Sequence, residues 1–306
     1  MSAARPSPFS DRLAALVESR RSQIALGLDP DPMRLWPDAV ERDDRSADAA
    51  ARTAAAVERH CRLAIEAAGP ACVAAKLQAA CFERLGAPGW SALAAVADDA
   101  RAAGLLVLVD AKRGDVPVTA RAYAQALVGE TSTPYGPVAG LGADAFTVNP
   151  IFGRDGLEPF VEAARGAGAG CFCLVRTSNP GAAEIQDASG PLYETLARLV
   201  DDVGAELVGD CGLSAVGAVT AATRPDLLGR LRELMPRTVF LLPGVGAQGG
   251  SIDALEAAFA PHPAAAIVTA SRSIVDAHLA RGGDPAAAAA AAAEDLRASA
   301  WELATR

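Results

Sequence analysis

The sequence predicts an α/β protein, a single (β/α)8 TIM barrel spanning residues 1–306. Eight short runs rich in Val, Leu, Ile and Ala recur along the chain, separated by longer amphipathic or alanine-rich stretches. Each run is almost continuously apolar, which is typical of parallel strands covered on both faces. Polar residues follow nearly every run, as expected where many strand ends meet at one barrel mouth. An open doubly wound sheet is the alternative, and it would gather such residues mainly at its switch point.

The predicted strands are spread over most of the chain. They are QIALGLD from Gln23, CVAAKLQ from Cys72, LLVLVDAK from Leu105, AFTVNP from Ala145, GCFCLVRT from Gly170, LSAVGAVTA from Leu213, TVFLLPGV from Thr238 and AAIVTAS from Ala265. Helices are expected between them, among others over residues 47–68, 90–103, 225–235 and 284–304. The last range contains eight consecutive alanines, but Asp284 and Pro285 supply the N-cap and first-turn signals of a helix. No linker or charge block divides the chain, so we expect one domain.

The composition limits the classes of partner. The chain has 37 acidic and 28 basic residues, a net charge of −9 and a hydrophobic fraction of 51%, enough for a large core. A general affinity for nucleic acid or for an anionic membrane is not expected, because both need a basic surface. A small anionic ligand stays possible where basic residues cluster. No stretch reaches the roughly 18 apolar residues of a membrane span. Asp11 and Glu18 interrupt the N-terminal region before a signal-peptide core, so no membrane segment or secretory leader is expected.

Histidine and cysteine usage argues against metal sites. The three histidines, His60, His262 and His278, do not stand at a metal-binding spacing, and the six cysteines include no C-x-x-C pair. Cys171 and Cys173 lie in the apolar run GCFCLV, where we expect them to be small buried residues of a strand. The sequence thus predicts no bound metal and a location in the reducing cytoplasm.

The most informative segment is VDAKRGDVPVTARAY, which starts at Val109. Side chains alternate along a strand, so Asp110 and Lys112 should project together into the barrel. Asp115 follows in the loop, and Pro117 opens a helix whose early turns hold Thr119. An ion pair that merely fills the barrel mouth is the alternative interpretation. Because a second lysine, Lys76, ends a neighbouring strand, and because burying several charges is costly, we favour a preorganised electrostatic site.

Two segments after the last two strands predict an anion site. LLPGVGAQGGS and TASRSI follow one another in the barrel, at the position where barrels commonly bind phosphate. Glycines in the first segment should let backbone N–H groups approach a ligand. Gln248 would add a side-chain donor and Arg272 a bidentate charged contact. A tight turn is the alternative for a glycine-rich loop taken alone.

Further polar residues carry weaker predictions. Ser178 and Asn179 could bind a polar ring or could cap the following helix. Asp29 could accept from ribose hydroxyls or could be a turn residue before Pro30. Asn149 could simply end its strand.

Together these motifs resemble a known family. AKRGD with its preceding Asp110, the strand end at Lys76, SNPGA, PGVGAQGG and SRSI occur in an order that resembles orotidine 5′-monophosphate decarboxylase, and the spacing of the whole chain resembles the longer bacterial branch of that family. The similarity runs over residues 24–274. The D-x-K-x-x-D segment alone would also suit related phosphosugar decarboxylases, whereas its combination with PGVGAQGG is specific.

The resemblance implies loss of CO2 from orotidine 5′-monophosphate to give uridine 5′-monophosphate, the last step of de novo pyrimidine biosynthesis, without metal or cofactor. It implies that Lys112 stabilises and protonates carbon 6 of the ring. It also implies a homodimer with shared active sites, because Asp115 and Thr119 match positions that reach into the partner subunit. The matching charged tetrad is Lys76, Asp110, Lys112 and Asp115. The matching substrate-binding residues are Asp29 for ribose, Ser178 for the pyrimidine, Gln248 and Arg272 for phosphate, together with Thr119 and Pro243.

Two features depart from that family or stay unassigned. Many members have Gly where this chain has Ser271, before the phosphate-binding arginine. Residues 131–142 form a longer connection than in short members, and no role is predicted for them. Two alternative functions stay open: a related phosphosugar decarboxylase, and a catalytically silent barrel that binds a nucleotide.

Overall fold

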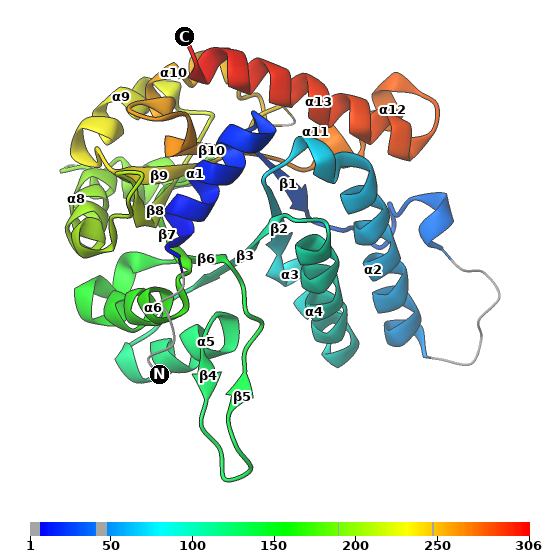
Figure 1. The fold of residues 1–306 in the computed structure, drawn as a ribbon, viewed down its shortest axis with the longest axis horizontal. Helices are drawn as coiled ribbons and strands as arrows, with labels where there is room; N and C mark the ends of the chain where they lie inside the picture. The colour runs from blue at the N-terminus through cyan, green and yellow to red at the C-terminus, as the bar shows by residue number, and fades with distance from the viewer. Residues whose placement is uncertain (1–6, 41–47, 189, 247) are drawn as a thin grey trace.

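Eight parallel strands close into a barrel in the computed structural model, which describes residues 7–40, 48–188, 190–246 and 248–306 (Figure 1). Neighbouring strands follow the order β1-β10-β9-β8-β7-β6-β3-β2 around the barrel. The predicted (β/α)8 barrel is therefore confirmed, and the open doubly wound alternative is wrong. Each predicted run forms one strand: β1 (Ile24–Leu28), β2 (Ala74–Gln78), β3 (Leu106–Arg113), β6 (Ala145–Val148), β7 (Gly170–Arg176), β8 (Ser214–Thr220), β9 (Thr238–Pro243) and β10 (Ala266–Ala270).

The strands are buried because helices cover the outer face while side chains fill the interior. Every residue of β1, β6, β8 and β10 is buried, as the continuous apolar runs predict. Cys171 and Cys173 are buried free thiols within β7, which confirms the prediction made for them.

The four predicted helices all form, with small changes at their ends. Range 47–68 becomes α2 (Ala49–Ala68), whose N-cap Asp48 accepts a hydrogen bond from the Ala51 N–H at 2.8 Å; residue 47 lies outside the described residues. Range 90–103 becomes α4 (Ala87–Ala102), and 225–235 becomes α9 (Pro225–Leu234). The alanine-rich range becomes α13 (Pro285–Ala304), capped by Asp284 as predicted.

Further helices complete the outer layer. They are α3 (Ala79–Glu83), α5 (Pro117–Leu127), α6 (Gly153–Ala167), α7 (Ala182–Gln186), α8 (Leu192–Gly204), α10 (Glu256–Phe259), α11 (Arg272–Val275) and α12 (Ala277–Arg281), with short 3₁₀ turns at Pro37–Ala39, Gly69–Ala71, Pro150–Phe152, Ala205–Leu207, Ile252–Ala254 and Pro263–Ala265. Pro117 opens α5 as predicted. In the part of the chain that the structure describes, no helix has both the length and the apolar character needed to cross a bilayer.

An N-terminal helix, α1 (Phe9–Arg20), was not predicted. Phe9 packs edge-on against Phe172 of β7 with ring centroids 5.7 Å apart. Arg20 donates to four carbonyl groups in the loops that precede β2 and β3. The helix thus ties together segments at the amino-terminal end of the barrel, opposite the end at which barrel enzymes place their sites.

Residues 131–142 contain part of a small hairpin. Strands β4 (Glu130–Thr131) and β5 (Val138–Ala139) pair antiparallel, and the hairpin extends away from the barrel beside α5 (Figure 1). Tyr135 at its tip is fully exposed.

Candidate active site

A cavity of about 360 Å³ opens at the carboxyl ends of the barrel strands. Residues on or directly after every barrel strand except β6 line it. Eight of the ten predicted site residues are among them: Asp29, Lys76, Asp110, Lys112, Ser178, Pro243, Gln248 and Arg272. The barrel closure therefore collects residues that lie up to 243 positions apart in the sequence, the separation of Asp29 and Arg272.

Asp110 lies at the centre of the charged residues. One carboxylate oxygen accepts from the Lys112 ammonium at 2.6 Å and from the Thr147 hydroxyl at 2.8 Å. The other accepts from the Lys76 ammonium at 3.1 Å. Asp110 is therefore bonded to both lysines, and only 7% of the residue is exposed to solvent.

Lys76 is the more deeply buried of the two lysines, at 5% exposed. Its ammonium donates to Asp29 at 3.1 Å and to the Gln78 side-chain carbonyl at 3.2 Å, in addition to Asp110. Burial alone would lower the pKa of Lys76, but the carboxylates of Asp29 and Asp110 outweigh it, so the pKa is raised. Lys76 is consequently a fixed positive charge behind Asp110.

Burial and neighbouring charges also oppose each other at Asp110, where the net effect lowers the pKa. Burial would raise the pKa of Asp110, but the charges of Lys76 and Lys112, with hydrogen bonds from Lys112 and Thr147, lower it to about 2. The carboxylate stays ionised throughout the neutral range. The opposite charges thus keep the Asp110 carboxylate and the buried Lys76 ammonium in their charged forms.

We expect Asp110 to make a pH-dependent contribution to stability. Its pKa of about 2 lies below an unfolded-state value of about 3.9, so the contribution is present above pH ~4 and is lost as the pH falls toward 2. The stability advantage of the wild type over Asp110→Asn should therefore be about 1 kcal/mol smaller at pH ~3 than at pH ~5. Urea unfolding at the two pH values measures it. An advantage that does not change with pH would contradict the depressed pKa.

Lys112 reaches Asp110 by a different backbone geometry from the one predicted. Its φ is 48°, in the left-handed region, and the pairing of β3 with β6 is irregular between Val109 and Arg113. The simple alternation of an extended strand is therefore wrong at this position, although the two side chains do meet. The Lys112 N–H donates to the Thr147 hydroxyl at 2.9 Å, which helps to hold this strained conformation.

Asp115 and Thr119 do not line the cavity of their own chain. Asp115 is half-buried and accepts from the Val116 N–H at 2.8 Å, while Thr119 is exposed near the start of α5. Of the predicted charged tetrad, one chain therefore brings together Lys76, Asp110 and Lys112.

The glycine-rich loop after β9 folds back on itself. Gly244 has a φ of 109°, a conformation that favours glycine, and its carbonyl accepts from the Gly250 N–H at 3.0 Å. The Gly246 N–H donates to the Gly250 carbonyl, and the Gly249 N–H donates to the Gly246 carbonyl. The prediction that backbone N–H groups approach a ligand is therefore wrong for Gly246, Gly249 and Gly250, which use theirs inside the loop. Side chains also line this part of the cavity, among them the amide of Gln248 and the guanidinium of Arg272.

The alternative roles of three polar residues can be compared with the structure. Helix α7 is capped at Gly181 with no side-chain hydrogen bond, so the helix-capping role of Ser178 and Asn179 is wrong. Both residues line the cavity instead. Asn149 directly follows β6, and its side chain accepts from the Ile151 N–H as the N-cap of the next 3₁₀ turn, in keeping with a local structural role.

Sequence reasoning missed Thr147 and Gln78, whose side chains bond directly to the charged residues. Nothing in the local pattern marks Thr147, which is buried inside an apolar strand. A compositional signal for the lysines was available. Lys76 and Lys112 are the only two lysines of the chain, among 28 basic residues in total. Lysine can give up a proton far more readily than arginine, so its restriction to one cavity indicates chemistry there.

Comparison with known proteins gives a consistent result. A family model described as "Orotidine 5'-phosphate decarboxylase / HUMPS family" matches residues 22–292. The orotidine 5′-phosphate decarboxylase of Rhodopirellula baltica is 41% identical over 273 residues, which cover 88% of this chain and 89% of that protein. The one from Deinococcus radiodurans is 39% identical and covers 93% of this chain and 94% of its own length. The solved structure of Leishmania donovani OMP decarboxylase is 32% identical, with a TM-score of 0.69, and covers 96% of this chain and 99% of that chain.

Proposed function

Because this chain belongs to the orotidine 5′-phosphate decarboxylase family, we propose that its barrel-mouth cavity is where orotidine 5′-monophosphate loses CO2 to give uridine 5′-monophosphate. This carboxy-lyase reaction is the last step of de novo pyrimidine biosynthesis. One observation carries the assignment: the Lys112 ammonium lies 2.6 Å from the Asp110 carboxylate in a cavity that Ser178, Gln248 and Arg272 also line.

The chemical difficulty is the carbanion left at carbon 6 of the pyrimidine ring. When the bond to CO2 breaks, its electron pair stays in an orbital that no π-system can delocalise. A fixed cation placed where this charge develops is the most effective stabiliser that a protein can offer. The Lys112 ammonium is that cation, and it then gives its proton to carbon 6 and regains one from water.

Asp110 and Lys76 hold Lys112 in place. Asp110 bonds both ammonium groups, and Lys76 is itself fixed by Asp29 and Gln78. Charges that are already oriented need no reorganisation when the carbanion forms. Repulsion between Asp110 and the substrate carboxylate would add ground-state destabilisation, to which we give second place.

The phosphate group supplies binding energy away from the reacting bond. Gln248 follows β9 and Arg272 follows β10, whereas the lysines lie on β2 and β3. Gln248 and Arg272 are the anion contacts of the cavity in this proposal. Asp29 contacts the ribose, Ser178 the pyrimidine, and Pro243 packs nearby.

Orotidine, which lacks the phosphate, should therefore be a very poor substrate. We expect its kcat/KM to be at least about a thousandfold below that of orotidine 5′-monophosphate, because the lost charged contacts no longer help to hold the base at Lys112. Initial rates with both substrates measure the ratio. Comparable values would contradict the assignment of Gln248 and Arg272.

The proposal includes a homodimer with shared active sites. Asp115 and Thr119 stay outside the cavity of their own chain, so a partner subunit's cavity is where they would act. Beside them lie exposed apolar side chains: Val118 is 85%, Ile151 56% and Phe152 47% exposed. Asp115 and Phe152 flank the same glycine at the start of α6, so Phe152 lies next to Asp115. An apolar patch of this kind is typical of a surface that another subunit covers.

The direct test is conversion of orotidine 5′-monophosphate by the purified chain, which is monitored as the loss of orotate absorbance. The proposed steps use only side chains, so EDTA should leave the rate unchanged, and recovery of activity on adding metal would contradict the mechanism. Turnover of a phosphosugar acid instead would indicate a related phosphosugar decarboxylase. Tight binding of uridine 5′-monophosphate with no CO2 release would indicate a catalytically silent nucleotide-binding barrel.

We also propose that the reaction takes place in the cytoplasm. The six cysteines are free thiols in the structure, and four of them are buried, in keeping with a reducing compartment.

A further inference from the structure

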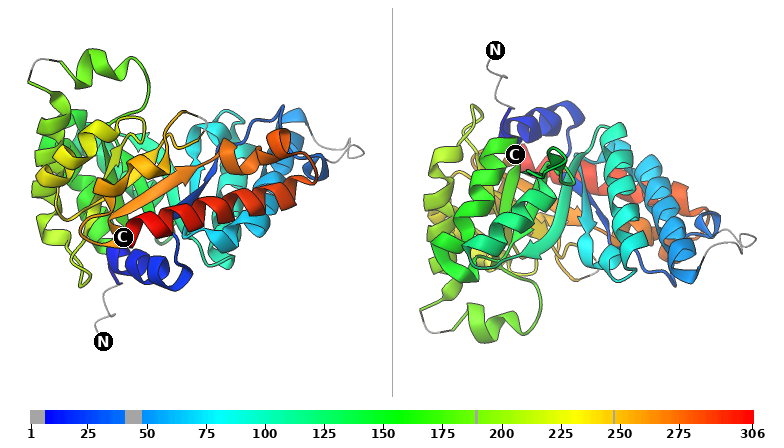
Figure 2. Two further views of the ribbon diagram at one scale, coloured as in Figure 1. Left: turned by 90° about the horizontal axis from the view of Figure 1, so that it is seen from above. Right: turned by 90° about the horizontal axis from the view of Figure 1, so that it is seen from below.

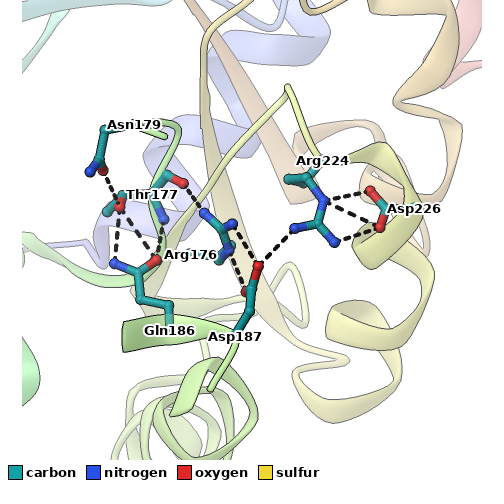
Figure 3. Close-up of polar contacts among 7 residues, drawn as sticks. All are labelled: Arg176, Thr177, Asn179, Gln186, Asp187, Arg224 and Asp226. Carbon is teal, nitrogen blue, oxygen red and sulfur yellow. Dashed lines mark hydrogen bonds and ion pairs between the residues drawn. The ribbon is translucent and has the colours of Figure 1, made fainter. Parts of the chain in front are cut away.

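Four charged residues form a chain of ion pairs beside the cavity (Figure 3). Arg176, at the end of β7, donates to both carboxylate oxygens of Asp187 at 2.8 and 2.9 Å. Arg224, in the loop after β8, donates to Asp187 at 3.0 Å and holds Asp226 through contacts of 2.7 and 2.9 Å. Asp187 is therefore the shared acceptor that joins the loop after β7 to the loop after β8.

Asp187 belongs to a segment that leaves the barrel and returns. The connection between β7 and α8 carries α7, which stands out from the side of the barrel in both views of Figure 2. Asp187 directly follows this helix. Its pairing with Arg176 thus brings the far end of the projecting segment back to the residue from which the segment starts.

Gln186 strengthens this connection. Its side-chain carbonyl accepts from the Thr177 N–H at 2.9 Å, and its amide group donates to the Thr177 hydroxyl at 2.9 Å. Arg176 also donates to the Thr177 carbonyl. The N–H, the carbonyl and the hydroxyl of Thr177 are all held by residues of this network.

The residues that are held line the cavity. Thr177, Ser178 and Asn179 face it consecutively, and the Thr177 hydroxyl donates to the Asn179 side-chain oxygen at 2.7 Å. Neither Arg176 nor Asp187 is among the lining residues. Arg176 and Asp187 would therefore affect a ligand by fixing the positions of Thr177, Ser178 and Asn179.

We propose that Asp187 is a positioning residue for the nucleobase side of the cavity: by joining Arg176 to Arg224, it fixes Thr177, Ser178 and Asn179 where they meet the pyrimidine ring. The identity of that ligand rests on the proposed function. The network itself is defined by the contacts above and holds the part of the cavity wall after β7, whereas Arg272, at the start of α11, lines the part after β10.

Charge explains why an acid is needed at this position. Only 4% of Arg176 is exposed, and a buried guanidinium without a carboxylate partner is strongly unfavourable. A hydrogen bond from Arg176 is the largest cause of the lowered pKa of Asp187; burial opposes it, and a hydrogen bond from Arg224 lowers the pKa further. Asp187 is consequently ionised at neutral pH, and together with Asp226 it balances the charges of Arg176 and Arg224.

The test compares two competitive inhibitors, uridine 5′-monophosphate and ribose 5-phosphate, which share the phosphate but differ in the base. In Asp187→Ala we expect the Ki of uridine 5′-monophosphate to rise between about ten- and a hundredfold, the usual cost of misplacing a contact. The Ki of ribose 5-phosphate should stay within about twofold, because its contacts lie on other strands. Asp187→Asn keeps the side-chain volume and should show a smaller change in the same direction. If Asp187→Ala does not fold, Asp187→Asn is the variant on which the comparison is made.

Asp202→Asn is the matched control, because it breaks an exposed aspartate–arginine pair with Arg154 outside the cavity. It should change neither inhibition constant. Equal rises for both inhibitors in Asp187→Ala, or no rise for either, would overturn the positioning role. Calorimetric titration gives the same comparison without turnover. A wild-type chain that binds uridine 5′-monophosphate but releases no CO2 would therefore reject the proposed function and still decide the role of Asp187.

Discussion

Lys112→Ala is expected to lower kcat by more than about 10⁴-fold while uridine 5′-monophosphate still binds. The change removes both the cation that faces the developing carbanion, worth about 10² to 10³, and the proton donor, worth about 10² to 10⁴. Binding should persist because Ser178, Gln248 and Arg272 follow other strands than the one that carries Lys112, and because Lys76 still donates to Asp110. Single-turnover rates with orotidine 5′-monophosphate and calorimetry with the product measure the two quantities.

Two further variants make this result specific. Lys112→Arg keeps a positive charge, but a guanidinium hardly releases a proton, so it should restore little turnover. Arg281→Ala removes an exposed cation paired with Asp295 and should leave the rate unchanged. Near-normal turnover of Lys112→Ala would refute the proposed role of this residue.

Mixing Asp115→Asn with Lys112→Ala subunits is expected to restore activity that neither variant has alone. In a shared site, one cavity of each hybrid dimer combines an intact Lys112 from one subunit with an intact Asp115 from the other. Random exchange of subunits should therefore give roughly a quarter of the wild-type activity, because half of the dimers are hybrids with one working site each. Activity of the mixture after unfolding and joint refolding measures this.

Subunit exchange must be shown independently, by mass spectrometry of dimers in which one variant is isotopically labelled. Each variant refolded alone is the control and should stay inactive. Hybrid dimers without activity would show that Asp115 does not act across the interface. A monomeric chain at the assay concentration would reject the shared site altogether.

Local patterns were sufficient for most of the architecture. The eight apolar runs predicted the eight barrel strands, and the cap formed by Asp284 and Pro285 predicted α13 despite its alanine run. Helix α1 was missed, although Phe9, Leu13 and Val17 stand four residues apart on its buried face. Such spacing is a local signal that could have been read.

Local patterns also identified most of the candidate site. Lys76, Asp110 and Lys112 stand at strand ends, and strand ends of a parallel barrel open at one mouth, so the fold class alone brings them together. The catalytic roles of these three residues stay proposals, as do the roles of Asp115 and Thr119 across a subunit interface. The variants described above test them.

The sequence by itself determined the strands, the motif residues and their common location, because hydrophobic runs and caps act between near neighbours. Only the tertiary structure decided the left-handed backbone of Lys112, the bond from Thr147 to Asp110 and the ion pairs of Asp187. Each of these depends on the register of neighbouring strands or on the path of a loop. Residues such as Thr147 and Asp110, 37 positions apart, meet only when barrel closure sets that register. No periodicity within one strand contains that information.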